Sequence, residues 1–135
     1  MQAVTTKVAK KQAVTTKVAK KKILQARAGV SVLPKIAKMA FGSGVVREDG
    51  TIIQPMEDQT RLNNEIGRFD ITNKEIVDDT KVTYYCKLQD SQLSEQAISE
   101  LALVDDDGDL LTIKNFAAKI KDSDFVFIFS IDDTM

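Results

Sequence analysis

The chain has 135 residues, of which 43% are hydrophobic and 29% are charged, and its formal net charge is −1. This length and composition are those of one globular domain with its own core. Histidine and tryptophan are absent and cysteine occurs once, which excludes a Ser-His-Asp or Cys-His catalytic set, a histidine-ligated metal and an internal disulfide. No apolar run approaches the ~18 residues of a membrane helix, so we expect no membrane span.

The charges are divided unevenly along the chain. Residues 1–27 contain eight basic side chains and no acidic one, whereas the remaining residues contain 11 basic and 20 acidic side chains. A basic arm on an acidic body suggests an acidic partner, which could be nucleic acid, an anionic membrane surface or the body of a neighbouring copy; the alternative is a solvated lysine-rich helix. The candidate partner-binding residues of this segment are Lys7, Lys10, Lys11, Lys17, Lys20, Lys21 and Lys22.

The basic segment contains an internal repeat. The sequence QAVTTKVAKK occupies residues 2–11 and recurs unchanged at residues 12–21. Because a period of ten residues matches neither a solenoid unit nor a coiled-coil heptad, we interpret the first copy as dispensable for the fold. We therefore divide the chain into a basic arm, residues 1–15, and a single domain, residues 16–135.

A helix is predicted over residues 16–28. Its apolar positions fall on one side of the helix: Val18, Ala19, Ile23 and Ala26. Thr15 or Thr16 is suited to cap the first turn, because a threonine hydroxyl accepts a hydrogen bond from a free backbone N–H group there. Gly29 is suited to end the helix.

The next segments predict a strand, a flap and a second helix. The strand covers residues 35–41 and ends at a Gly-Ser-Gly loop. Asp49-Gly50 lies between two pairs of β-branched residues, which predicts a hairpin over residues 45–56 that we interpret as a small flap. Residues 58–65 follow, and they predict a short helix.

The second half of the chain is predicted to consist of strands. Residues 68–77 and 81–90 should form a long antiparallel hairpin, and residues 98–116 a second hairpin that turns at an Asp-Gly pair. Residues 125–131 are almost entirely apolar, which predicts a strand inside a sheet or inside an oligomer. Their aromatic side chains are further candidate partner-binding residues: Phe125, Phe127 and Phe129. The predicted fold class is α+β, an N-terminal helix followed by a mainly antiparallel β-sheet domain with one further short helix.

No segment carries a set of catalytic, cofactor-binding or metal-binding residues. Residues 105–109 are rich in aspartate, but aligning Gly108 with the glycine of an EF-hand puts Leu103 and Lys114 where that loop needs carboxylates. Cys86 lies in a predicted strand, where a lone cysteine is usually a small hydrophobic residue. The sequence therefore predicts no enzyme activity, no cofactor and no bound metal.

Binding to nucleic acid or to an anionic surface through the lysine-rich arm is the alternative function. Eight positive charges could neutralise several phosphates. However, residues 1–27 contain no aromatic side chain for stacking on bases, and the acidic body would repel phosphates. We therefore keep nucleic-acid or anionic-surface binding as the alternative and not as the leading function.

Three motifs occur in an order that resembles a known family. They are Met39–Gly44 (MAFGSG), Gln59–Glu65 (QTRLNNE) followed by Arg68, and Ile98–Leu103 (ISELAL) followed by Asp107–Leu110. With the preceding helix and the apolar last strand, this order resembles the N-terminal domain of phage tail-collar and tail-fibre proteins over about residues 15–131. The chain departs from the family's pattern at Ala102, where glycine is usual, and in its N-terminal repeat.

The resemblance implies a structural protein of a phage tail or of a prophage-derived, phage-like tail. Such a protein attaches fibres or other parts to the baseplate through protein–protein contacts. The resemblance therefore implies other tail, baseplate or fibre proteins as partners, together with a homo-oligomer, because tail-fibre assemblies are commonly trimers. It also implies a location in the tail of the virion, after synthesis in the cytoplasm of a bacterial host.

Overall fold

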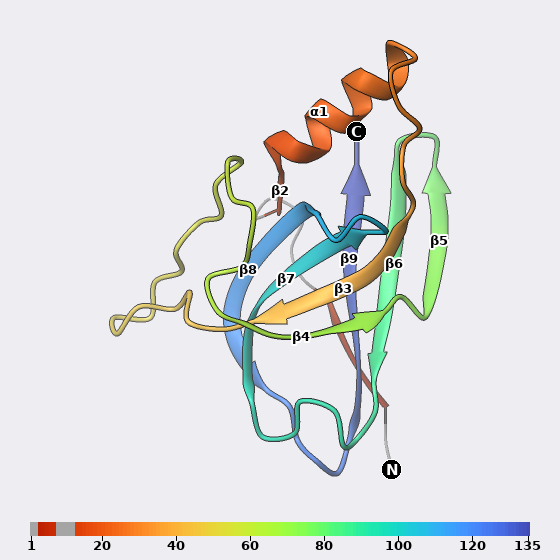
Figure 1. Cartoon of the computed structure of the whole chain (residues 1–135). Coiled ribbons are helices and arrows are strands. Elements are labelled where there is room, and N and C mark those ends of the chain that lie inside the picture. Colours follow the sequence, from red (N-terminus) through yellow and green to blue (C-terminus); the bar gives the residue numbers. More distant parts are fainter. Residues whose placement is uncertain (1–2, 8–12) are drawn as a thin grey trace.

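The structure is a computed structural model that describes residues 3–7 and 13–135 (Figure 1). Within these residues the chain forms nine strands and one helix. In chain order they are β1 (Ala3–Lys7), β2 (Ala13–Thr15), α1 (Lys17–Arg27), β3 (Ile36–Gly42), β4 (Glu65–Asp70), β5 (Asn73–Asp78), β6 (Lys81–Leu88), β7 (Ala97–Asp105), β8 (Leu110–Ile120) and β9 (Val126–Thr134).

The strands form two sheets. A four-stranded sheet has the order β1-β9-β6-β5, and a five-stranded sheet has the order β2-β8-β7-β3-β4. The neighbouring strands are antiparallel except for β1 and β9, which run parallel. Helix α1 lies across one end of the sheets, near the C-terminus (Figure 1).

The predicted α+β fold class is wrong, because the described chain is mainly β and two strands precede its helix. The second helix, predicted over residues 58–65, does not form; those residues make turns that lead into β4. The backbone N–H groups of Asn63 and Asn64 there donate to the Glu100 carboxylate of β7, at 2.7 and 3.1 Å. Asparagine also favours turns, because its side chain competes for backbone hydrogen bonds.

The helix predicted over residues 16–28 is confirmed as α1. The Thr16 hydroxyl accepts a hydrogen bond from the Ala19 N–H at 3.1 Å and so caps the first turn. Gly29 follows the last turn with φ of +74°, a conformation that strains residues with a side chain. None of the described helices is long and apolar enough to cross a membrane.

Several predicted strands are confirmed with shifted ends. β3 corresponds to the predicted strand over residues 35–41, and β7 with β8 to the predicted hairpin over residues 98–116. The last predicted strand is β9, which lies between β1 and β6 and therefore inside a sheet. The flap over residues 45–56 contains an isolated bridge between Val46 and Ile52 and lies outside both sheets.

The long hairpin predicted from residues 68–77 and 81–90 is only partly right. The first of these segments is divided between the two sheets, because β4 pairs with β3 whereas β5 pairs with β6. Only β5 and β6 form the expected antiparallel hairpin. The chain therefore changes sheets between Asp70 and Asn73.

The main core lies between the two sheets. Phe41 of β3 and Phe129 of β9 meet edge to face, with ring centroids 5.3 Å apart. Burial of each such side chain contributes roughly 1.5–3 kcal/mol. A smaller apolar cluster lies on the opposite face of the five-stranded sheet: Ala40, Leu62, Ala102, Val104, Leu110 and Ile113.

Candidate functional site

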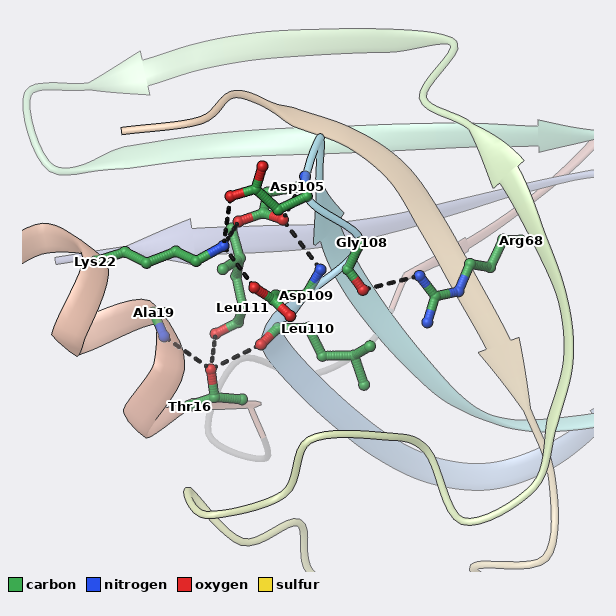
Figure 2. A network of polar contacts seen from close by, with 10 residues as sticks. Thr16, Ala19, Lys22, Arg68, Asp105, Gly108, Asp109, Leu110 and Leu111 are labelled. Atoms are coloured by element: carbon green, nitrogen blue, oxygen red, sulfur yellow. Dashed lines mark hydrogen bonds and ion pairs between the residues drawn. The ribbon is translucent and has the colours of Figure 1, made fainter. Parts of the chain in front are cut away.

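An ion cluster joins helix α1 to the turn between β7 and β8 (Figure 2). The Lys22 Nζ lies 2.6 Å from Asp105 Oδ2, 2.7 Å from Asp109 Oδ2 and 3.1 Å from Asp107 Oδ2. The Asp105 side chain is fully buried, and the Lys22 side chain is 16% exposed. Burial lowers the pKa of Lys22, but hydrogen bonds to the three aspartates outweigh this effect and raise the pKa above its usual value. The cluster therefore holds a charged lysine against the turn.

The turn itself is fixed by further hydrogen bonds. Asp105 Oδ1 accepts from the backbone N–H groups of Asp107 and Asp109, both at 3.0 Å, so the buried carboxylate has partners on both oxygens. Arg68 of β4 donates from Nη1 to the Gly108 carbonyl at 3.0 Å (Figure 2). These contacts stabilise the turn and give both oxygens of the Asp105 carboxylate a partner within the chain.

Thr16 joins the start of α1 to β8 (Figure 2). Its hydroxyl donates to the Leu110 carbonyl at 2.8 Å, and its backbone N–H donates to the Leu111 carbonyl at 3.0 Å. Thr16 is fully buried. Together with Lys22, it fixes α1 to the sheets at two points along the helix.

The three aspartates of the ion cluster also have the spacing of metal ligands. Their oxygen atoms lie within 4.8 Å of one another, which makes them a candidate metal group in the described part of the chain. The Lys22 ammonium already lies among these oxygens and supplies the positive charge. We therefore assign the cluster a structural role.

A second polar cluster lies where the three sequence motifs meet. Glu100 is fully buried and accepts the backbone N–H groups of Asn63 and Asn64, while Asn64 Nδ2 donates to Ser43 Oγ at 2.9 Å. Burial raises the pKa of Glu100, although the two N–H donors oppose this effect. Gly42 has no room for a side chain, because a Cβ atom there would collide with the Glu100 carboxylate and the Asn64 carbonyl. The motifs thus fix the loop over residues 43–64 to the sheet.

The structure places the predicted lysines in different surroundings. Lys22 lies in the ion cluster, and Lys20 Nζ lies 3.3 Å from the carboxylate of Glu57 at the surface. Two are exposed: Lys17 and Lys21. The side chains of three lie outside the described residues: Lys7, Lys10 and Lys11. Partner binding by these lysines stays a prediction, and Lys22 is already occupied within the chain.

The predicted aromatic contacts lie in or against the core. Phe129 is fully buried, Phe127 is 9% exposed, and Phe125 is partly buried against the same cluster. Within the described chain these rings help to hold the two sheets together. Their role in binding a partner stays a prediction.

The thiol of Cys86 is not suited to chemistry. It is buried in the core, and burial raises its pKa to about 12. Because the thiolate is the nucleophile, a thiol with this pKa is unreactive near neutral pH. The structure thus supports the interpretation of Cys86 as a core residue.

Sequence reasoning missed the roles of Glu100 and Lys22. Glu100 did carry a signal, because it is a charged residue in an otherwise largely apolar strand, where burial requires hydrogen-bonding partners. Lys22 carried no such signal, because it is the last of three consecutive lysines in the sequence. Only the tertiary fold brings Asp105 next to it.

Comparison with known proteins gives a match to one family. A family model described as "Phage tail-collar fibre protein, N-terminal" matches residues 8–125, a range that contains α1, the three motifs and both polar clusters. No curated protein and no solved structure matches the chain. The match confirms the resemblance expected from the motifs. The chain therefore belongs to the phage tail-collar fibre protein N-terminal family.

Proposed function

We propose that the chain is a structural component of a phage or phage-like tail that attaches fibres or other parts to the baseplate through protein–protein contacts. The observation that carries this proposal is the match to a tail-collar fibre family over most of the chain. The geometry supports it, because the buried carboxylates of Glu100 and Asp105 bind backbone groups and Lys22. A domain whose buried carboxylates are bonded within the chain in this way is suited to a structural role, in which other proteins bind its surface.

The surface offers apolar groups for such contacts. Val30 and Val32, in the loop between α1 and β3, are 72% and 92% exposed, and Ile76 of β5 is 79% exposed. Exposed apolar side chains are candidate contact points for a partner protein where they form a continuous surface. We propose that tail proteins bind over these side chains.

Tails from a strain that lacks the gene test the proposed attachment. We expect negative-stain electron microscopy to show tails without fibres, and the wild-type gene supplied on a plasmid to restore them. Tails that keep a full set of fibres without the protein would contradict the proposal. A plasmid with an early stop codon in the gene is the matched control.

We also propose a homo-oligomer, with a trimer favoured. Light scattering of the purified chain should then give three times its 14.9 kDa, with and without residues 1–14. A monomer at every concentration in both forms would contradict this part of the proposal without affecting the role in the tail.

A further inference from the structure

A pocket of about 470 Å³ lies between the flap and the turns that follow it. Its walls come from the flap over residues 45–56 and from residues 58–63, which extend beside β8 (Figure 1). The five-stranded sheet contributes Glu100 of β7 and Asn115 of β8. We call this cavity the flap pocket.

Glu100 and Asn115 lie opposite each other in the sheet. The two residues are paired in the register of β7 and β8, so their side chains share one face. Ala102 and Ile113 are the next pair on that face, and both belong to the smaller apolar cluster. The flap pocket therefore contains two buried polar side chains at the edge of an apolar surface.

Asn115 has an acceptor without a partner among the described residues. It is 3% exposed, and its Nδ2 donates to the Ile53 carbonyl of the flap at 2.7 Å. Because a carbonyl only accepts hydrogen bonds, Nδ2 must be the atom that meets Ile53, which leaves the amide oxygen Oδ1 free. Oδ1 is buried and accepts no hydrogen bond. A buried acceptor in this state is destabilising, so it indicates a donor that the described chain does not supply.

Glu100 is a buried acid without a counter-ion. It is fully buried and forms no ion pair with any described residue. The buried acid of the ion cluster, Asp105, has Lys22 at 2.6 Å instead. Burial raises the pKa of Glu100, and the N–H groups of Asn63 and Asn64 only partly offset this effect. A cation in the flap pocket would stabilise the charged carboxylate.

The other charged groups of the flap pocket do not neutralise Glu100. Arg61 lines the pocket, but it is exposed and forms no ion pair with a described residue. Asp58 is also exposed and adds a second negative charge. Ile53 and Met56 line the pocket with side chains that are 39% and 62% exposed. These groups suit a ligand with an aliphatic stem and a positively charged end that carries several N–H donors.

We propose that the flap pocket binds the guanidinium group of an arginine from another tail protein, with Glu100 as its counter-ion and Asn115 Oδ1 as a hydrogen-bond acceptor. A guanidinium group spreads its N–H donors over a plane, so it can serve acceptors on two neighbouring strands, whereas a lysine ammonium is a point charge. The aliphatic stem contacts Ile53 and Met56. The flap shifts to admit the group, because Ile53 covers the Asn115 amide and lies outside both sheets. The inference rests on the proposed function, because the arginine belongs to a tail protein.

The ligand chemistry is tested with Nα-acetyl-L-arginine amide as the probe. Titration into the ¹⁵N-labelled full-length chain should shift the side-chain amide signals of Asn115 and the backbone signals of Asn63 and Asn64 in NMR spectra. Nα-acetyl-L-citrulline amide has the same shape without the charge, and it should bind about tenfold or more weakly. Equal affinity for the two probes would overturn the cationic ligand. If neither probe binds, ordered water is the only partner of Asn115 and the site is overturned.

Variants of the pocket locate the bound probe. Asn115→Leu keeps the size of the side chain and removes the acceptor, so it should weaken binding about tenfold or more. Asn73→Leu is the matched control, because Asn73 is exposed on β5 in the other sheet, and it should bind as the wild type does. Wild-type affinity in Asn115→Leu would overturn the assignment of Oδ1 as an acceptor.

Two further variants leave the buried groups unchanged. Thr60 is an exposed residue of the pocket wall, so Thr60→Trp should block the pocket and abolish binding of the probe. Arg61→Gln removes a positive charge from the wall and should bind the probe at least as tightly as the wild type does. Wild-type affinity in Thr60→Trp, or a loss of binding in Arg61→Gln, would overturn the site.

The source of the arginine is tested in tails. A strain that lacks the gene receives the Thr60→Trp or the Asn73→Leu gene on a plasmid, and its tails are purified. Quantitative mass spectrometry should find less of the Thr60→Trp chain than of the Asn73→Leu chain in these tails. Equal amounts, with a probe that binds the wild-type chain, would overturn a tail protein as the source of the arginine.

The outcomes separate this inference from the proposed function. A probe that does not bind the purified chain overturns the flap pocket as a site, and it leaves the family match and the role in the tail untouched. Tails that keep their fibres without the protein contradict the proposed attachment, whereas the probe titration uses no tails and tests the pocket alone.

Discussion

Residues 3–7 and residues 13–17 share the sequence Ala-Val-Thr-Thr-Lys, yet the structure uses them differently. In the first copy all five residues form β1, which runs parallel to β9 in the four-stranded sheet. In the second copy three residues form β2, antiparallel to β8 in the five-stranded sheet, and the lysine begins α1. The comparison shows that these residues have no fixed local preference and that tertiary contacts decide their structure.

The two copies differ in the residue that follows them in the sequence. The second copy is followed by Lys22, which enters the ion cluster, whereas the first copy is followed by Gln12. In the structure Thr16 bonds to the carbonyls of Leu110 and Leu111 while Lys22 lies beside Asp105. We therefore expect the ion cluster to select which copy starts the helix, and the next four predictions test this selection.

The largest effect is expected from Asp105→Ala. The substitution removes a fully buried carboxylate that binds Lys22 and two backbone N–H groups. The two N–H groups lose this acceptor, and Lys22 keeps only Asp107 and Asp109. We expect a loss of about 3 kcal/mol in the free energy of unfolding, measured by urea denaturation. Asp106→Ala, at an exposed position of the same turn, should change it by less than about 0.5 kcal/mol. Equal losses in the two variants would show that the cluster does not hold α1.

The threonines of the two copies provide a matched pair. Thr16→Val removes the helix cap and the bond to Leu110, so it should cost about 1–2 kcal/mol in urea denaturation. Thr6→Val changes the same residue type in β1 and should cost less than about 0.5 kcal/mol, because valine is favoured in strands. Similar losses in the free energy of unfolding for the two variants would mean that the two copies contribute equally to stability, which would contradict a special role of the second copy.

Lys22→Gln makes the residue after the second copy the same as the residue after the first. It should cost about 1 kcal/mol and let the first copy compete for β8. Oxidative cross-linking detects the exchange, with cysteines at Thr112 and at either Thr15 or Thr5. The Thr15 and Thr112 positions are paired in the structure, so their disulfide should dominate in the wild-type background. A Thr5–Thr112 disulfide that stays absent in Lys22→Gln would contradict selection by Lys22.

The pH dependence of stability gives the smallest of these effects. The pKa of Lys22 is raised in the folded state above its ordinary value of 10.5. The folded state therefore holds the proton more tightly, and this contribution is complete below that value and is lost as the pH rises through the folded pKa. The stability advantage of the wild type over Lys22→Gln should thus shrink as the pH rises above about 10. A stability advantage of the wild type over Lys22→Gln that grows as the pH rises would contradict this contribution of Lys22.

Local signals predicted the parts of the fold that depend on neighbouring residues. The helix over residues 16–28 follows from Thr16, Gly29 and an apolar stripe, and the hairpin over residues 98–116 follows from alternation around Gly108. Both elements are found in the structure. The three motifs also identified the family correctly.

The errors lie where distant residues decide the structure. The segment over residues 58–65 becomes a turn because Glu100, more than 30 residues away, binds its N–H groups. The segment over residues 68–77 changes sheets, which alternation of residues within it cannot reveal. The sequence identified the lysines as candidate contact residues. It could not show that Lys22 is largely buried while Lys17 and Lys21 are exposed, because this depends on the position of Asp105 in the fold.

Quantitative mass spectrometry of density-gradient-purified tails tests the central claim most directly. The account predicts that the chain co-purifies with tails in a fixed ratio to the other tail proteins and stays bound in repeated gradients. Tails that contain none of it, while the protein remains in the unassembled fraction, would contradict its role as a structural component of the tail.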